Sequence, residues 1–486
     1  MRRFLSMTAS LIGLAIAGGC GGHNDEQPNI QRDQGASNKS VSSSRTSSPA
    51  GDLVSNRLDN WHQWRGPNAN GLAPKGNPPT QWDESTNIKW KVKIPGNGSS
   101  TPIVWKNQVF ALTAVKTDRK PNTTDKPADE DENPHSNRRG SRRRSFRMST
   151  PTPTTLYQFV ILCLDRETGK PTWKKVANQE VPHEGHHSSH GYASASPTTD
   201  GQFLYASFGS RGIFCYDLDG NFQWKRDLGD MQTKIGFGEA TSPVLHGDSL
   251  IVNWDHEGDS FIACLDAKTG DKKWQVPRDE DTTWATPLVV EYDGTTQVVT
   301  NAKNRTRSYD LANGNLIWEC GGQASNPIPS PVTLDGMVYC MTGFREFALH
   351  AIPLDVKGDI TDSEKISWQR NDAAPYVASP LLYEDLLYFT KERTGILFCV
   401  NAKSGEVYYS NKRLPGINLL YASLVGAAGK VYIAGRDGIT VVLKHGPKYE
   451  VLGTNQLDEG IDASPVIVGS QLFLKGNKHL YCIATN

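Results

Sequence analysis

The stretch "SASPTTDGQFLYASF" at residues 194–208 shows the unit from which this chain is built. A Ser-Pro pair enters a short apolar strand, Asp200 and Gly201 supply a turn, and a second alternating strand follows. Proline is tolerated at the first residue of a strand because the N–H that it lacks need not join the ladder. The stretch therefore predicts a β-hairpin.

The same hairpin pattern recurs along the chain, and eight copies can be aligned. The residues at the proline position are Pro102, Pro197, Pro243, Pro287, Pro331, Pro380, Leu424 and Pro465. From the second copy onward they lie 46, 44, 44, 49, 44 and 41 residues apart, whereas the first gap is 95 residues. An insertion at residues 116–156 explains the long gap.

A second pair of strands follows most hairpins and ends at an aromatic residue, as in "CLDRETGKPTW" at 163–173. Four strands in about 45 residues, repeated eight times, predict an all-β fold, an eight-bladed β-propeller of four-stranded antiparallel blades. The last copy ends in "HLYCIATN" and lacks a fourth strand. We expect "NIKWKVKIP" at 87–95 to supply it, so that both ends of residues 61–486 share the last blade.

The first 60 residues read as an export segment followed by a tether. Two arginines precede an apolar stretch and "AGGC", which predicts a lipoprotein signal peptide at 1–19 with Cys20 lipidated. Cleavage to a soluble exported protein is the alternative. Residues 20–60 are polar and rich in serine and glycine, which predicts a disordered tether. The chain would then sit in the bacterial cell envelope.

Charge gives no reason to expect nucleic acid as a partner, because 52 Lys and Arg balance 52 Asp and Glu. Within the 116–156 insertion an acidic run precedes six arginines between 138 and 147, which predicts disorder. The insertion is either a solvated loop or a contact for an envelope polyanion.

The pattern C-x-D-x-x-T-G-x-x-x-W at 163–173 and 264–274 resembles the tryptophan-docking motif of pyrroloquinoline-quinone (PQQ) type propellers. The resemblance covers about residues 82–486. It implies structural docking by Trp90, Trp173, Trp224, Trp274 and Trp318, with Gly169, Gly270 and Gly314 as the motif glycines. Two branches are relevant: quinoprotein dehydrogenases, which bind PQQ and calcium, and non-catalytic BamB-like lipoproteins.

If the Ser/Thr-Pro strand is innermost, the loops before it and after the second strand share one face, where propellers of this family place ligands. We expect a binding face that contains His190, Tyr192, Glu239, Asp255, Trp284, Arg305, Arg345, Tyr376, Arg393, Arg436 and Asp462. Its repeated basic positions favour an anionic group. A polar loop face without a ligand is the alternative.

The four histidines of "HEGHHSSH" at 183–190 raise the possibility of a metal site. His186 and His190, with His256, are candidates for zinc or copper, although their spacing matches no closed metal motif. If PQQ were bound, calcium would need oxygen ligands, and Glu239 and Asp255 are candidates.

The cysteines argue against the dehydrogenase branch. Five of them, Cys163, Cys215, Cys264, Cys399 and Cys482, share one place in the repeat and are predicted to fill docking slots. Cys320 and Cys340 are the pair left open to a disulfide. No two cysteines are adjacent, whereas quinoprotein dehydrogenases carry a vicinal disulfide.

No catalytic residues can be assigned. We therefore expect a lipid-anchored, non-catalytic binding or scaffolding module for an envelope protein or a small anionic ligand. A PQQ- and calcium-dependent oxidoreductase of alcohols or sugars is the alternative.

Overall fold

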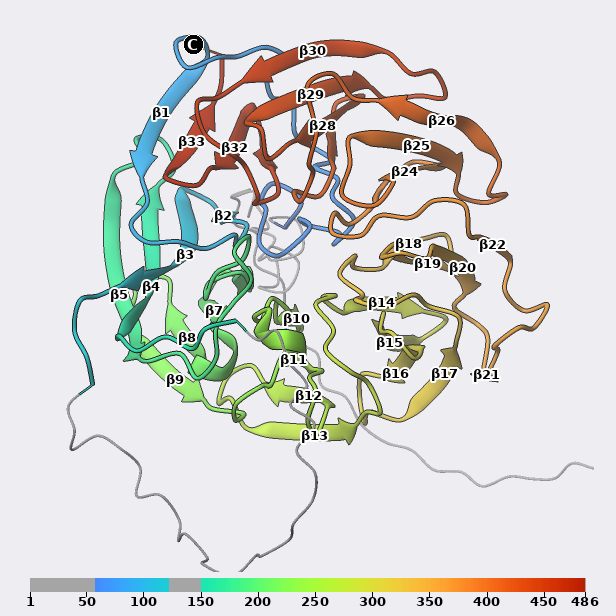
Figure 1. Cartoon of the computed structure of the whole chain (residues 1–486), viewed down its shortest axis with the longest axis horizontal. Coiled ribbons are helices and arrows are strands. Elements are labelled where there is room, and N and C mark those ends of the chain that lie inside the picture. The colour runs from blue at the N-terminus through green and yellow to red at the C-terminus, as the bar shows by residue number, and fades with distance from the viewer. Residues whose placement is uncertain (1–56, 122–149, 486) are drawn as a thin grey trace, which may run out of the picture. The chain divides into compact units, whose positions relative to one another are not determined.

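The computed structural model describes residues 57–121 and 150–485, which form eight β-sheets arranged as a ring (Figure 1). Seven sheets have four strands and one has five. Short 3-10 turns at Gly209–Arg211 and Lys234–Gly236 interrupt the loops. The predicted eight-bladed, all-β propeller is confirmed. None of the described helices is long and apolar enough to cross a membrane.

Blades 1 to 4 follow one another in sequence. Blade 1 contains β2 (Ile103–Trp105), β3 (Gln108–Lys116), β4 (Tyr157–Asp165) and β5 (Pro171–Glu180). Blade 2 contains β6 (Thr198–Thr199), β7 (Phe203–Ser207), β8 (Ile213–Asp217) and β9 (Phe222–Arg226). Blade 3 contains β10 (Val244–His246), β11 (Ser249–Trp254), β12 (Phe261–Asp266) and β13 (Lys272–Pro277). Blade 4 contains β14 (Leu288–Tyr292), β15 (Thr295–Thr300), β16 (Thr306–Asp310) and β17 (Leu316–Cys320), with β21 (Gly358–Asp359) added outside.

Blades 5 to 8 complete the ring. Blade 5 contains β18 (Val332–Leu334), β19 (Met337–Thr342), β20 (Ala348–Pro353) and β22 (Trp368–Arg370). Blade 6 contains β23 (Leu381–Tyr383), β24 (Leu386–Thr390), β25 (Ile396–Asn401) and β26 (Val407–Arg413). Blade 7 contains β27 (Val425–Ala427), β28 (Lys430–Ala434), β29 (Ile439–Lys444) and β30 (Val451–Gln456). Blade 8 contains β31 (Val466–Val468), β32 (Gln471–Lys475), β33 (His479–Ile483) and β1 (Ile88–Lys93).

The two ends of the propeller meet in blade 8, as predicted. Strand β1 pairs antiparallel with β33, and Trp90 lies opposite Cys482. This pairing covers the edge that β33 would otherwise expose. Residues 1–19, Cys20 and most of the 20–60 segment lie outside the described residues, as does the centre of the insertion, 122–149.

Docking tryptophans join neighbouring blades, and each one reaches the glycine of the following blade. The pairs are Trp90 with Gly169, Trp173 with Gly220, Trp224 with Gly270, Trp274 with Gly314, and Trp368 with Gly405. In each pair a Cβ on the glycine would lie 2.7 to 2.9 Å from the indole. Each indole N–H also donates to a backbone carbonyl of that following blade at 2.8 to 3.0 Å. The glycine of a motif therefore packs against the tryptophan of the preceding blade, not against the tryptophan of its own motif.

Trp318 departs from this pattern. Its side chain is fully buried, but its Nε1–H donates to Gln297 Oε1 of its own blade at 3.1 Å. Blade 5 has an extended segment in place of the glycine turn, and β21 within that segment pairs parallel with β17 beside Trp318. The short strand takes the place of the usual docking turn.

The seven cysteines of the described residues are buried and free. Burial raises the pKa of the Cys163 thiol to about 11 and that of Cys215 to about 12. Cys320 and Cys340 form no disulfide. The five motif cysteines are therefore small apolar fillers of the sheets, as expected from the repeat.

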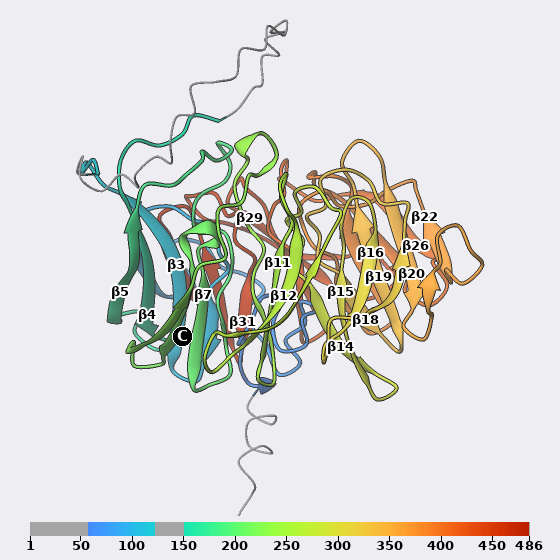
Figure 2. The ribbon, with the colours of Figure 1, turned by 90° about the horizontal axis from the view of Figure 1, so that it is seen from below.

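Residues 61–82 cross one face of the ring, seen as the blue segment along the lower edge of Figure 2. Trp61 exchanges backbone hydrogen bonds with Val104 of blade 1. The buried Arg65 guanidinium donates to the carbonyls of Leu424 at 2.7 Å and Pro380 at 2.5 Å. Burial lowers the pKa of Arg65 to about 9. The His62 carbonyl accepts from the Thr199 N–H of blade 2 and Trp64 donates to Ser330 of blade 5, so the contacts of the segment reach both sides of the ring and the segment passes across the axis.

Candidate functional site

A belt of eight hydroxyl groups surrounds the axis. The residue before each inner strand, at the position ahead of the repeated proline, is Ser or Thr in all eight blades: Thr101, Ser196, Ser242, Thr286, Ser330, Ser379, Ser423 and Ser464. In seven of the eight steps, the backbone N–H of one blade donates to the hydroxyl oxygen of the next at 2.9 to 3.1 Å. The Ser or Thr at this position thus ties a blade to its neighbour at seven of the eight junctions.

The eighth hydroxyl, that of Ser330, receives its hydrogen bond from the N-terminal segment instead of from Thr286. Trp64 Nε1 donates to Ser330 Oγ at 3.2 Å. The indole therefore lies against the belt on the side that residues 61–82 cross. It forms part of the base of the axial space.

These hydroxyls line an axial cavity of about 500 Å³. Aromatic side chains form much of its wall: Trp64, Phe237, Trp284, Phe344, Tyr376 and Tyr421. Trp284 is fixed by a hydrogen bond from its Nε1 to the Gly238 carbonyl at 2.6 Å. Phe344 and Tyr376 pack together with ring centroids 4.8 Å apart. The volume is that of a pocket for a small organic molecule.

Two exposed arginines, Arg345 and Arg393, line the loop end of this cavity. Neither has an ion pair with any of the described residues. Arg345 adopts a left-handed backbone conformation (φ 67°) and lies over the Phe344 ring at 5.2 Å. Arg393 Nη1 donates to Tyr421 Oη at 3.4 Å. Cations without counter-ions beside a cavity favour an anionic ligand.

A second cavity of about 340 Å³ adjoins the first and shares His190 and Asp462 with it. Arg436 lines it and holds Asp462 through two hydrogen bonds of 2.6 and 3.0 Å. Lys475 also lines it, and burial lowers the pKa of this lysine to about 7. Arg436 is thus neutralised by a partner, unlike the two arginines at the axial mouth.

The structure brings only part of the predicted binding face together. Six of its residues line the axial cavity: His190, Trp284, Arg345, Tyr376, Arg393 and Asp462. Arg436 lines the adjoining cavity, whereas Tyr192 and Glu239 line a separate small pocket.

Asp255 and Arg305 do not reach either cavity. Asp255 is completely buried and forms two hydrogen bonds with the equally buried Arg278, at 2.7 and 3.1 Å. Arg305 pairs with Asp359 of the outermost strand of blade 4 at 2.8 Å. Asp255 forms an ion pair within blade 3, whose Arg278 also donates to Thr300 and Tyr309 of blade 4. Arg305 is held at the outer edge of the ring. Asp255 is therefore not available as a calcium ligand.

Several cavity residues were missing from the expected set. Trp64 lies in the segment before the repeats, and Phe237 and Phe344 are apolar residues in loops chosen for their charged members. The hydroxyl belt carried a detectable signal, because Ser or Thr occupies the same position in all eight copies.

The predicted histidine set does not form a cluster. Among the described residues, one group of at least three His, Cys, Asp or Glu side chains has its possible metal-ligand atoms within 4.8 Å of one another. It consists of His183, Glu184 and Glu239. His256 Nδ1 accepts from the Gln232 N–H at 3.1 Å. The ring nitrogens of His190 are buried, and burial lowers the pKa of this histidine to about 4.

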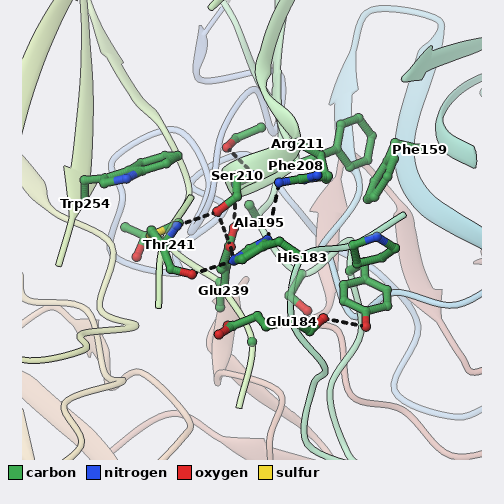
Figure 3. Close-up of a pocket in the computed structure, with 18 of the residues that line it drawn as sticks. Phe159, His183, Glu184, Ala195, Phe208, Ser210, Arg211, Glu239, Thr241 and Trp254 are labelled. Atoms are coloured by element: carbon green, nitrogen blue, oxygen red, sulfur yellow. Dashed lines mark hydrogen bonds and ion pairs between the residues drawn. The ribbon is translucent and has the colours of Figure 1, made fainter. Parts of the chain in front are cut away.

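The His183 cluster lies in a small pocket of about 30 Å³ between blades 2 and 3 (Figure 3). Glu239 accepts a hydrogen bond from the Ser210 N–H at 2.7 Å and one from the Ser210 hydroxyl. Burial raises the pKa of Glu239 to about 7. Glu184 accepts from the Thr233 N–H, and His183 Nε2 contacts the Met231 carbonyl at 2.6 Å. The cluster is satisfied by its own protein partners.

The axial cavity does not fit the calcium and quinone of PQQ-dependent dehydrogenases. Calcium takes six to eight oxygen ligands, usually with several carboxylates. The carboxylates that line the axial cavity are Glu392 and Asp462. Glu392 is exposed at the rim, and Asp462 is held by Arg436. The seven cysteines of the described residues are buried, and no two cysteines are adjacent in the sequence, so there is no vicinal pair to place beside a quinone.

Solved structures to which this chain is similar include BamB from Moraxella catarrhalis and a europium-containing methanol dehydrogenase. The BamB structure is 13% identical with a TM-score of 0.47, and the match covers 67% of this chain and 91% of BamB. The dehydrogenase is 11% identical with a TM-score of 0.46, over 89% of this chain and all of the dehydrogenase. No curated protein matches the sequence.

A family model described as outer membrane protein assembly factor BamB matches residues 158–411. The match runs from β4 of blade 1 to β26 of blade 6 and includes four of the five docking pairs entirely. Since it spans more than half of the chain, this protein belongs to that family of PQQ-like β-propellers.

Proposed function

We propose that the protein is a non-catalytic binding module of the bacterial cell envelope that holds a small anionic ligand in its axial cavity. The observation that carries the proposal is the pair Arg345 and Arg393, which lie unpaired at the mouth of a 500 Å³ cavity. An anionic group placed between them would gain two charge-assisted hydrogen-bonding partners.

The envelope location rests on two supports. The family is described by an outer-membrane assembly factor, and the first twenty residues have the pattern of a lipoprotein signal with Cys20 as the lipidated residue. Lipid attachment at Cys20 would be tested by mass spectrometry of the membrane-extracted protein, with Cys20→Ala as the control that loses the lipid.

Binding is favoured over oxidation because the axial cavity has only two carboxylates among the described residues, one exposed at the rim and one held by Arg436, and because no two cysteines are adjacent. A PQQ-dependent oxidoreductase remains the second candidate, on the ground of the family and of the aromatic cavity wall. The decisive assay adds PQQ and calcium to the purified full-length protein. It then measures dye reduction with alcohols and sugars. Turnover above the protein-free background would replace the binding role with an enzymatic one.

The anionic ligand itself is tested by calorimetry with small carboxylates, among them glutarate and glucuronate. The Arg345→Ala/Arg393→Ala protein should lose at least tenfold in affinity, since each lost charged hydrogen bond removes about 1.5–3 kcal/mol. Arg305→Ala is the matched control, because this arginine pairs on the outer edge of blade 4. Equal affinities in all three proteins would refute the assignment of the axial mouth as the anion site.

A further inference from the structure

The hydroxyl belt has hydrogen-bonding capacity that the described protein does not use. Each of the eight hydroxyl oxygens accepts one hydrogen bond, seven from a neighbouring blade and one from Trp64. None of the eight donates its own O–H to any described residue. All eight residues are buried to 94% or more, and all line the axial cavity.

A hydroxyl in this state offers one donor and one remaining lone pair toward the cavity. A ligand that both donates and accepts at neighbouring positions satisfies such groups, and a polyhydroxylated molecule does so along its whole edge. An apolar ligand would strip water from the belt and leave its donors without partners, which is unfavourable. The belt therefore selects for hydroxyl groups on the ligand.

The wall beyond the belt suits the same class of ligand. In the sequence, Trp284 and Tyr376 precede the belt residues Thr286 and Ser379 by two and three positions, so they lie toward the loop end. Aromatic faces pack against the C–H surfaces of a sugar ring, while its hydroxyl edge remains free for hydrogen bonds. The arginines lie further out, in loops that join second and third strands.

The order from base to mouth is thus hydroxyl donors, aromatic faces and unpaired cations. We propose that the axial cavity binds an acidic carbohydrate, with its hydroxyl groups on the belt and its carboxylate on Arg345 and Arg393. This inference rests on the proposed function and names its ligand class. The acidic sugar is either a free sugar acid or the terminal unit of an acidic polysaccharide.

The test is calorimetry on the full-length protein with three small probes. Glucuronate has both hydroxyls and a carboxylate, glucose lacks the carboxylate, and glutarate lacks the sugar hydroxyls. We expect glucuronate to bind at least tenfold more tightly than either of the others. If glutarate binds as well as glucuronate, and both depend on the two arginines, the carbohydrate inference fails while the proposed function stands. If no probe binds, both fail. If glucose binds as tightly as glucuronate, the carboxylate contributes nothing, and the acidic part of the inference and the anionic ligand of the proposed function both fail.

A belt variant separates the hydroxyls from the arginines. Ser379→Ala should weaken glucuronate about tenfold and leave glutarate unchanged, whereas Ser379→Thr, which keeps the hydroxyl, should retain the parental affinity. Weaker glucuronate binding in both variants, or in neither, would overturn the role of the belt. Oligogalacturonate distinguishes the two sources of the acidic sugar. Tighter binding of the oligomer than of glucuronate indicates the terminal unit of a polysaccharide, and weaker binding indicates a free sugar acid.

Discussion

Substitution of Gly169 by alanine should weaken the ring at its seam. Gly169 has φ +71°, and a Cβ there would lie 2.7 Å from the indole of Trp90, the tryptophan of the closing strand. Gly294 offers a matched control, because its φ is +74° and a Cβ there meets nothing within 4 Å. The two substitutions therefore share the backbone strain and differ in the steric conflict.

The expected magnitudes follow from these two contributions. A left-handed alanine costs roughly 1–2 kcal/mol, which is the whole effect expected for Gly294→Ala. Overpacking against a buried side chain adds about 1–3 kcal/mol, so Gly169→Ala should lose about 2–5 kcal/mol in total. Urea unfolding followed by tryptophan fluorescence and by far-UV circular dichroism measures the difference.

A double-mutant cycle with Trp90→Ala identifies the cause. Once the indole is gone, Gly169→Ala should cost no more than Gly294→Ala, because the steric conflict has been removed. Equal losses for the two glycine variants in the parent protein, or strictly additive effects with Trp90→Ala, would refute blade docking through this contact.

Three further outcomes are expected. Burial raises the pKa of Glu239 from 4.5 to about 7, so the folded protein retains a proton that the unfolded chain releases, and stability falls as pH rises between these values. Glu239→Gln should therefore flatten the dependence of the thermal midpoint on pH between about 5 and 8 and raise the midpoint at pH 8; an unchanged slope would contradict this. Asp255→Asn should destabilise by about 3–5 kcal/mol in urea titrations, because it leaves the Arg278 charge buried without a partner, and Asp255→Asn/Arg278→Met should recover much of the loss. The seven buried cysteines should react with a thiol reagent only after denaturation, leaving at most Cys20 reactive in the native protein, and early labelling of a second thiol would show that a blade opens.

The propeller could be predicted from the sequence because its signals are local and repeated. A Ser/Thr-Pro hairpin and a second pair of strands that ends at an aromatic residue appear in successive copies. Trp90 occupies that aromatic position in the strand that completes the last blade. The docking partner could not be read in the same way, since Gly169 and Trp173 belong to one motif but contact different blades. Residues of one motif are neighbours in the sequence, but the residue that each of them contacts lies in whichever blade is adjacent in the ring.

The candidate site was harder to predict because a loop does not disclose the direction of its side chains. Arg345 and Arg305 occupy equivalent loops, yet the first reaches the axial cavity and the second pairs with the outer strand β21. That strand comes from an irregular segment of blade 5 without a counterpart in the other copies. Asp255 forms a buried ion pair with Arg278, which lies after the fourth strand of blade 3 and outside the loops of the expected binding face.

The segment that crosses the base of the ring has a consequence for the order of assembly. The carbonyls that accept from Arg65 lie 315 and 359 residues later in the chain, so Arg65 cannot dock until blades 6 and 7 exist, whereas Trp61 pairs with Val104 of blade 1. Docking of Arg65, near the start of the described residues, is therefore among the last steps of folding. Contacts of such long sequence separation are slow to form. Because Trp64 donates to Ser330 of blade 5, its indole stays accessible to water, and to chaperones, until that blade has been made.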